Sequence, residues 1–368
     1  MTFNKVLENV TTYEAGKPIE LVVREYGVDP KDIVKLASNE NPYGTSPKVT
    51  AKIQDLAKNM FIYPDDSMYE LKESLAKKFD VLTDNVIIGS GSDQILEYCV
   101  HTKCNENSKI LMAKTTFAMY EIYGKQTGST IIKTKSDTHN LEQFSALYKE
   151  YGADVIFLCL PNNPLGECLD KKEVYDFLET IDSDTLVVVD GAYQEYASFK
   201  DEAKAINPKD LITSFPNCIY LGTFSKAYAL GGMRVGYGIG NIDIVKNLYK
   251  LRAPFNITTL SLAAAIEAVN DEEFVNECIA KNFEEMTRYE TYAKAKGFDY
   301  IESYTNFITI KFGDLYSSKE VAQELLQKGV IVRDLTGYGV NAIRVTIGTN
   351  VQNTKVFEVL DGVLEKLK

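Results

Sequence analysis

Histidine is scarce in this chain, which contains only His101 and His139 among its 368 residues. A histidine-based metal centre or a Ser-His-Asp triad therefore has little support, and we expect no metal. His139 lies in the polar stretch 136–140, for which we expect a surface loop. The six cysteines show no Cys-x-x-Cys spacing, so neither a zinc site nor a disulfide framework is expected.

The chain also lacks net positive charge and long apolar runs. Its net charge of −12 argues against a nucleic-acid-binding surface. No stretch is long and apolar enough to span a bilayer, and charges interrupt the apolar residues at the N-terminus, unlike in a signal peptide. We therefore expect no membrane association and a cytoplasmic location. At 368 residues, 45% of them hydrophobic, the chain is long enough for two domains.

One lysine is surrounded by groups that bind phosphate. Lys226 ends the run Thr223-Phe-Ser225-Lys226, and Arg234 follows after two glycines. Residues 217–223 are typical of a buried strand, which places Lys226 just past a strand's carboxyl end, where ligands collect in open α/β sheets. A lysine there can form a Schiff base with pyridoxal 5'-phosphate. Taken alone, the Ser-Lys pair would favour an ordinary surface-loop lysine.

Two further apolar runs end in polar side chains. Residues 154–160 lead into Pro161-Asn-Asn163-Pro, a rigid turn that can hold an amide at a fixed place. Residues 185–190 end in Asp190, with Tyr193 three residues on. A carboxylate at the edge of a buried run needs a cationic partner, and a protonated pyridine nitrogen supplies one.

A phosphate site is indicated upstream. The strand-like residues 85–89 lead into Ser90-Gly91-Ser92-Asp93 and then a helical pattern. A helix that begins with small and capping residues is suited to bind an anion.

Together these motifs, in this order, resemble the fold type I pyridoxal-phosphate-dependent aminotransferases. Within them, the segments beginning at Tyr13, Lys35 and Tyr63 resemble the histidinol-phosphate aminotransferase subfamily. The resemblance covers about 13–348. It implies an α/β fold, with a large domain built on a mainly parallel seven-stranded sheet and a smaller C-terminal α/β domain. It also implies the cofactor pyridoxal 5'-phosphate.

The resemblance assigns roles to individual residues. Lys226 would carry the cofactor and move the substrate proton, and Asp190 would pair with the pyridine nitrogen. Asn163 and Tyr193 would bind the ring oxygen, while Phe117 would stack on the ring, unless it is ordinary core. The remaining cofactor-binding residues are Gly91, Ser92, Asp93, Thr223, Ser225, Arg234 and, from the partner subunit of a homodimer, Tyr63. The substrate-binding residues are Arg333, Arg344, Tyr13 and Asn163.

Some positions depart from the family pattern. Gly191 stands where glutamate is usual, Thr115 replaces proline, Leu165 replaces threonine and Phe117 replaces tyrosine. None of these changes removes a group that the chemistry needs. Tyr63 has a simpler interpretation as well, because a tyrosine at this place can cap the core of its own subunit.

Periodicity divides the chain into an N-terminal arm at 1–30, a large domain at 31–252 and a small domain at 253–368. The arm is expected to lie on the small domain. Beyond residue 254 the pattern predicts helices at 258–270 and 272–296, and short strands at 306–312, 330–333 and 342–347.

The resemblance implies transfer of an amino group between L-histidinol phosphate and 2-oxoglutarate, with glutamate as the product of the latter, in histidine biosynthesis. An aromatic amino acid aminotransferase is the nearest alternative. A phosphothreonine decarboxylase shares the scaffold, and a non-catalytic pyridoxal-phosphate sensor is a third alternative, although no DNA-binding module is visible.

Overall fold

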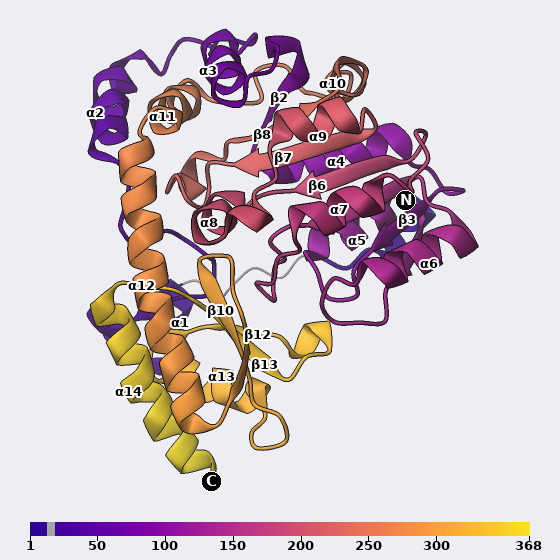
Figure 1. Cartoon of the computed structure of the whole chain (residues 1–368). Coiled ribbons are helices and arrows are strands. Elements are labelled where there is room, and N and C mark those ends of the chain that lie inside the picture. The colour runs from indigo at the N-terminus through magenta and orange to yellow at the C-terminus, as the bar shows by residue number, and fades with distance from the viewer. Residues whose placement is uncertain (13–18) are drawn as a thin grey trace.

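In the computed structural model, which describes residues 1–12 and 19–368, a seven-stranded sheet forms the centre of the larger part of the molecule (Figure 1). Its order is β2-β8-β7-β6-β5-β3-β4. Neighbouring strands are parallel except at β8, which runs antiparallel to β7 and β2. The predicted mainly parallel seven-stranded sheet is therefore confirmed. The strands are β2 (Val86–Gly89), β3 (Lys109–Met112), β4 (Thr130–Lys133), β5 (Val155–Cys159), β6 (Leu186–Asp190), β7 (Cys218–Thr223) and β8 (Gly236–Gly240).

The central strands are buried on both faces, because alternate side chains enter two separate cores. Along β6, Val187 and Val189 join one cluster, and Leu186 and Val188 join the other. This explains the continuous apolar runs in the sequence. One core includes residues of α2 (Pro47–Leu56), α3 (Tyr69–Phe79), α6 (Leu141–Tyr151), α7 (Lys171–Leu178), α8 (Gln194–Lys200), α9 (Pro208–Ser214) and α11 (Thr259–Val269). The other includes residues of α4 (Ser92–Lys103), α5 (Ala118–Gln126) and α10 (Ile242–Tyr249).

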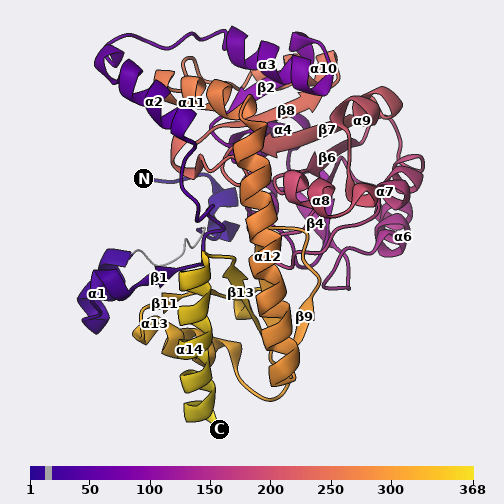
Figure 2. The same cartoon turned by 60° about the vertical axis from the view of Figure 1, so that its left-hand side comes forward.

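A smaller α/β part follows α11. The helix α12 (Glu272–Lys296) extends from the large part along the small one, where α14 (Asn350–Leu367) lies beside it (Figure 2). Their apolar faces and α13 (Ser318–Gln327) cover an antiparallel sheet of order β12-β13-β10-β9. Its strands are β9 (Asp299–Ile301), β10 (Phe307–Lys311), β12 (Arg333–Asp334) and β13 (Ala342–Thr346). The predicted helices and the strands at 306–312 and 342–347 agree closely with these bounds.

The N-terminal arm does not lie wholly on the small part, as the sequence led us to expect. The 3-10 helix η1 (Lys5–Asn9) packs on α5 of the large part, whereas α1 (Ile19–Tyr26) packs on α13. Next along the chain, β1 (Val34–Lys35) pairs in parallel with β11 (Val330–Ile331). The sequence missed this split because the arm has no strong periodicity. The domain boundaries at 30 and 252 remain predictions.

No helix among the described residues is both long and apolar enough to cross a bilayer. The cytoplasmic location remains a prediction.

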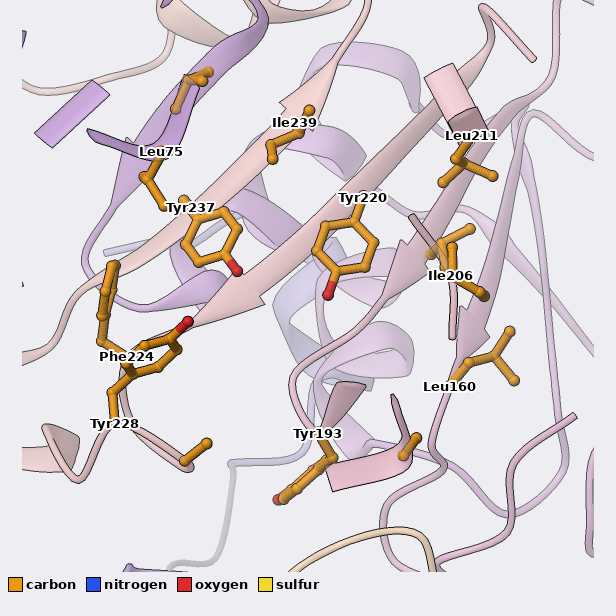
Figure 3. Packing of buried hydrophobic residues seen from close by; sticks show 14 of the residues in the cluster. Leu75, Leu160, Tyr193, Ile206, Leu211, Tyr220, Phe224, Tyr228, Tyr237 and Ile239 are labelled. Atoms are coloured by element: carbon orange, nitrogen blue, oxygen red, sulfur yellow. The ribbon is translucent and has the colours of Figure 1, made fainter. Parts of the chain in front are cut away.

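Gly191, one of the departures from the family pattern, makes room for a tyrosine. A Cβ atom at this position would lie 2.5 Å from the hydroxyl oxygen of Tyr220, whose ring projects from β7 (Figure 3). Tyr220 is 3% exposed and belongs to the larger core, so its ring has little space to move. A glutamate at position 191 would therefore clash with the core in this chain.

We predict that Gly191→Ala lowers the free energy of unfolding by about 1–3 kcal/mol, the usual cost of overpacking. Denaturant titration measures this cost. Gly362→Ala in α14 is the control, because the added methyl group meets only the Lys328 ammonium, at 3.9 Å, and should be neutral or stabilising. In a Tyr220→Leu background the cost of Gly191→Ala should shrink; an unchanged cost would contradict the packing explanation.

Candidate active site

A cavity of about 260 Å³ lies at the carboxyl ends of β5, β6 and β7, where the small part meets the large sheet. Cys159, Asp190 and Thr223, the last residues of these strands, line its base, and Arg333 and Arg344 line it from β12 and β13. The predicted site residues that line it are Gly91, Ser92, Asp93, Phe117, Asn163, Asp190, Tyr193, Thr223, Ser225, Lys226, Arg234, Arg333 and Arg344. The structure thus brings residues from distant segments of the sequence to one place.

Lys226 is the one lysine among the described residues that line this cavity. It follows β7, and its Nζ donates a hydrogen bond to the Ser38 carbonyl at 3.3 Å. Burial, together with the nearby charges of Arg344 and Arg234, lowers the pKa of this amine to about 8. The lowered pKa increases the neutral fraction of Lys226 near physiological pH compared with an ordinary lysine, and a nucleophilic or basic amine reacts in its neutral form.

Asp190 ends β6 and is 3% exposed. Its Oδ2 accepts a hydrogen bond from the Tyr120 hydroxyl at 2.7 Å, and its Oδ1 accepts one from the Ala192 N–H at 3.1 Å. Burial raises the Asp190 pKa to about 6, although both donors oppose that effect. No side-chain cation is hydrogen-bonded to it among the described residues, so a cationic ligand group is its natural partner.

Asn163 and Tyr193 are held by hydrogen bonds that the sequence did not indicate. Arg344 Nη1 donates to Asn163 Oδ1 at 2.6 Å, and its Nη2 donates to the Ala37 carbonyl at 2.7 Å. The Tyr193 hydroxyl accepts from Asn39 Nδ2 at 2.8 Å. Asn39 itself has a left-handed backbone, with φ of 55°, which asparagine adopts more readily than most residues. The segment 37–39 thus fixes several cavity residues at once.

The opposite end of the cavity is built to hold an anion. The helix α4 begins at Ser92, directed at the cavity, and Arg234 Nη1 donates to Ser225 Oγ at 3.2 Å. A Cβ atom at Gly91 would lie 2.6 Å from Arg234 Nη2, and one at Gly236 would overlap the Ser92 nitrogen. Only glycine at these two positions leaves the guanidinium and the helix N-terminus close together. Backbone N–H groups, hydroxyls and an arginine form a donor set that suits phosphate.

The expectation that His139 lies in a surface loop was wrong. Its side chain is 1% exposed, its Nδ1 lies 3.3 Å from Glu167 Oε1, and its ring stacks on Phe144 at 5.9 Å. The same Glu167 oxygen accepts from Asn162 Nδ2 at 2.8 Å. The sequence did not reveal the burial of His139, because its neighbours in the chain are polar and its partners lie in other segments. Among the described residues, no group of three or more His, Cys, Asp or Glu side chains is arranged to hold a metal ion.

Two predicted residues lie elsewhere. Tyr63 is 78% exposed and does not line the cavity; its ring packs on Phe255 with the centroids 4.7 Å apart. Its simpler interpretation, as a cap on the core of its own subunit, does not fit that exposure. Tyr13 lies outside the described residues. Residues of the cavity to which the sequence assigned no binding role include Ser38, Asn39, Cys159 and Tyr338.

Comparison with known proteins supports the interpretation of this cavity as the active site of an aminotransferase. Residues 31–360 match the family of class I and II aminotransferases. The chain is 75% identical to the histidinol-phosphate aminotransferase of Aliarcobacter butzleri and 60% identical to that of Wolinella succinogenes, in both cases over 100% of each chain. A solved structure of histidinol-phosphate aminotransferase from Sinorhizobium meliloti, in complex with pyridoxal-5'-phosphate, superposes with a TM-score of 0.91 at 24% identity, covering 100% of this chain and 98% of that one.

We predict that Lys226 reacts with amine reagents at lower pH than an exposed lysine does. Its lowered pKa means that the neutral, reactive amine dominates above about pH 8. Lys172 is the control, since its ion pair with Asp176 raises its pKa. Reductive methylation of the cofactor-free protein across pH, followed by peptide mass spectrometry, measures both. Equal pH midpoints for the two lysines would contradict the electrostatics described above.

Proposed function

This chain belongs to the histidinol-phosphate aminotransferases, a branch of the class I and II aminotransferases, and we propose that its cavity residues perform the amino-group transfer between L-histidinol phosphate and 2-oxoglutarate. The enzyme depends on pyridoxal 5'-phosphate. When bound, this cofactor supplies an electron sink that lets a proton leave the carbon bearing the amino group. The observation that carries the proposal is the convergence of Lys226, Asp190 and the anion cradle on one cavity.

Each part of the cofactor has residues in the cavity that would bind it. The N-terminus of α4, Ser225 and Arg234 would hold the phosphate. The buried Asp190 carboxylate would hold the pyridine nitrogen in its protonated form, because the two opposite charges stabilise each other at a site with little water. Phe117, which lines the same cavity, would support the ring.

Asn163 and Tyr193 would bind the ring oxygen. Their positions support this role, because each is held by a further residue: Asn163 by Arg344, and Tyr193 by Asn39. Preorganised donors of this kind do not need to reorient during the reaction.

Lys226 Nζ would take the proton from the substrate carbon and return it to the cofactor side. A general base works best when its pKa lies near the working pH, and the pKa of about 8 meets that condition. Phe224 and Ala227, both fully buried, anchor the segment that carries Lys226.

Arg344 and Arg333 would bind the distal anion of both substrates. They are direct partners on the antiparallel strands β13 and β12, and both line the cavity. Neighbours on adjacent strands lie close enough for two guanidinium groups to share one ligand. A phosphate in one half-reaction and a carboxylate in the other can therefore use the same pair.

We further propose a homodimer in which Tyr63 reaches the cofactor phosphate of the partner subunit. Tyr63 belongs to a group of large apolar side chains that are exposed, which is typical of a protein-binding surface. They are Met60, Phe61, Ile62, Tyr63 and Phe255. The Tyr63–Phe255 contact presents both rings on the same surface.

We predict a strong preference for histidinol phosphate over phenylalanine when the purified, cofactor-loaded enzyme is assayed across amino donors with 2-oxoglutarate. The two arginines favour an anion at the distal end of the donor, which phenylalanine lacks. Comparable kcat/KM for the two donors would instead indicate an aromatic amino acid aminotransferase. Release of carbon dioxide from a phosphorylated amino acid would indicate the decarboxylase, and no turnover with any donor would indicate a sensor.

We predict that Arg333→Ala and Arg344→Ala each weaken transition-state binding of both substrates by about 1.5–3 kcal/mol, the contribution of a charged hydrogen bond. The effect of Arg344→Ala should be the larger, because Arg344 also holds Asn163. The exposed Arg24→Ala is the control. Measured kcat/KM for donor and acceptor gives the comparison. A loss confined to the phosphorylated substrate would show that the two substrates use separate anion sites.

We predict that an inactive Lys226→Ala subunit and an inactive Tyr63→Ala subunit regain activity when they are mixed and allowed to exchange. A heterodimer restores one complete site, whose lysine and tyrosine come from different chains. Subunit exchange is verified with a tag on one variant. Exchange without recovered activity would rule out the shared site.

A further inference from the structure

The Tyr120 hydroxyl is directed at the carboxylate proposed to hold the pyridine nitrogen. Tyr120 lies in the first turn of α5, is 0% exposed, and donates to Asp190 Oδ2 at 2.7 Å. It does not line the cavity, so it acts from behind Asp190. Among the described residues, two groups donate to this carboxylate, and Tyr120 is the only side chain of the two, since the other donor is the Ala192 backbone.

Neighbouring rings fix the position of that hydroxyl. The Tyr120 ring stacks on Phe157 of β5, with centroids 4.3 Å apart and an interplanar angle of 1°. The Tyr120 and Phe117 rings form a T-shaped pair, with centroids 5.7 Å apart and an interplanar angle of 85°. The same side chain thus supports both Phe117, which lines the cavity, and Asp190. A ring in so confined a position can hold a carboxylate in one orientation.

We propose that Tyr120 is a positioning residue that orients the Asp190 carboxylate and keeps it ionised for the pyridine nitrogen of the cofactor. This inference rests on the proposed function, because it concerns the role of Asp190 toward the cofactor.

The electrostatics around Asp190 support this role. Burial and the neighbouring Asp93 raise the Asp190 pKa, whereas the Tyr120 hydroxyl, the Ala192 N–H and Lys226 lower it. Cys159, its partner on β5, contributes no charge, because burial raises the pKa of its thiol. Burial likewise raises the Tyr120 pKa well above its ordinary value, so the phenol remains a donor throughout the working pH range. Without this donor, the carboxylate would keep only the backbone hydrogen bond.

Tyr120→Phe separates positioning from packing, since it keeps the ring and removes only the hydroxyl. Tyr289→Phe is the matched control: Tyr289 is 1% exposed and its hydroxyl donates to Asn353, within the small part. Both variants lose one buried hydrogen bond and should lose similar stability. Only Tyr120→Phe should affect Asp190.

Two measurements on the whole chain test whether the Tyr120 hydroxyl acts on Asp190. Infrared or NMR titration with carbon-13-labelled aspartate, with Asp190→Asn identifying the signal, gives the Asp190 pKa in the cofactor-free form. Fluorescence titration gives the dissociation constant of pyridoxal phosphate across pH. In Tyr120→Phe we expect the Asp190 pKa to rise by about one and cofactor binding to weaken about tenfold, the effect of losing a charged hydrogen bond. The weakening should grow as the pH falls through the raised pKa, because more of the carboxyl is then protonated.

A double-mutant cycle provides the second test. Adding Tyr120→Phe to Asp190→Asn should cause little further loss of cofactor affinity, since no ionised carboxylate remains to be oriented. The proposal is overturned if, in Tyr120→Phe, the acid dissociation constant of Asp190 and the dissociation constant of the cofactor are both within twofold of their values in the Tyr289→Phe control. It is also overturned if Tyr120→Phe weakens cofactor binding as much in the Asp190→Asn background as in the wild type. If Tyr120→Phe fails to fold while Tyr289→Phe folds, Tyr120→Met, which lacks the donor but fills the core, takes its place. Neither measurement requires turnover, so a failed aminotransferase assay would count against the proposed function and not against this role.

Discussion

The turn at residues 161–166 is the constraint on which the arrangement of the site depends, because both parts of the molecule attach to it. Arg344 of β13 donates to Asn163, and Thr309 of β10 donates to the Pro164 carbonyl at 2.8 Å. The backbone N–H of Tyr304 donates to the Gly166 carbonyl, also at 2.8 Å. These bonds tie the small sheet to the carboxyl end of β5. An error in this turn would displace the two arginines relative to the residues at the ends of β6 and β7.

Residues behind the cavity reinforce the same turn. Asn162 is 0% exposed and donates to the Thr115 carbonyl at 2.9 Å and to Glu167, which also faces His139. The Thr116 hydroxyl donates to Asn162 Oδ1 at 2.9 Å. Each of these polar groups finds a partner in a different segment, so the network specifies the turn and the adjacent end of β3 together.

The charges that line the cavity differ from the charge of the whole chain. The chain carries a net charge of −12, yet Lys226, Arg234, Arg333 and Arg344 line the cavity and suit it to anionic ligands.

The sequence predicted those parts of the site that are local in the chain. Asp190 ends an apolar strand, and Lys226 and Asn163 follow such strands within a few residues, so each stands out in the local sequence. The resemblance carried by the ordered motifs then assigned their roles. Tyr120, Asn39 and His139 were missed or misread for the opposite reason. Their partners lie 70, 154 and 28 positions away, respectively, and no local pattern reports such contacts. Similarly, the long helices and most strands followed from their periods, whereas β1 and β9 are too short to show one.

Borohydride reduction of the cofactor-loaded enzyme tests the central claim most directly, because it fixes the cofactor covalently to the lysine that carries it. Peptide mass spectrometry then locates the modified residue. We expect the added mass on the peptide that contains Lys226 and on no other. Modification of a lysine outside the cavity would contradict the assignment of this site.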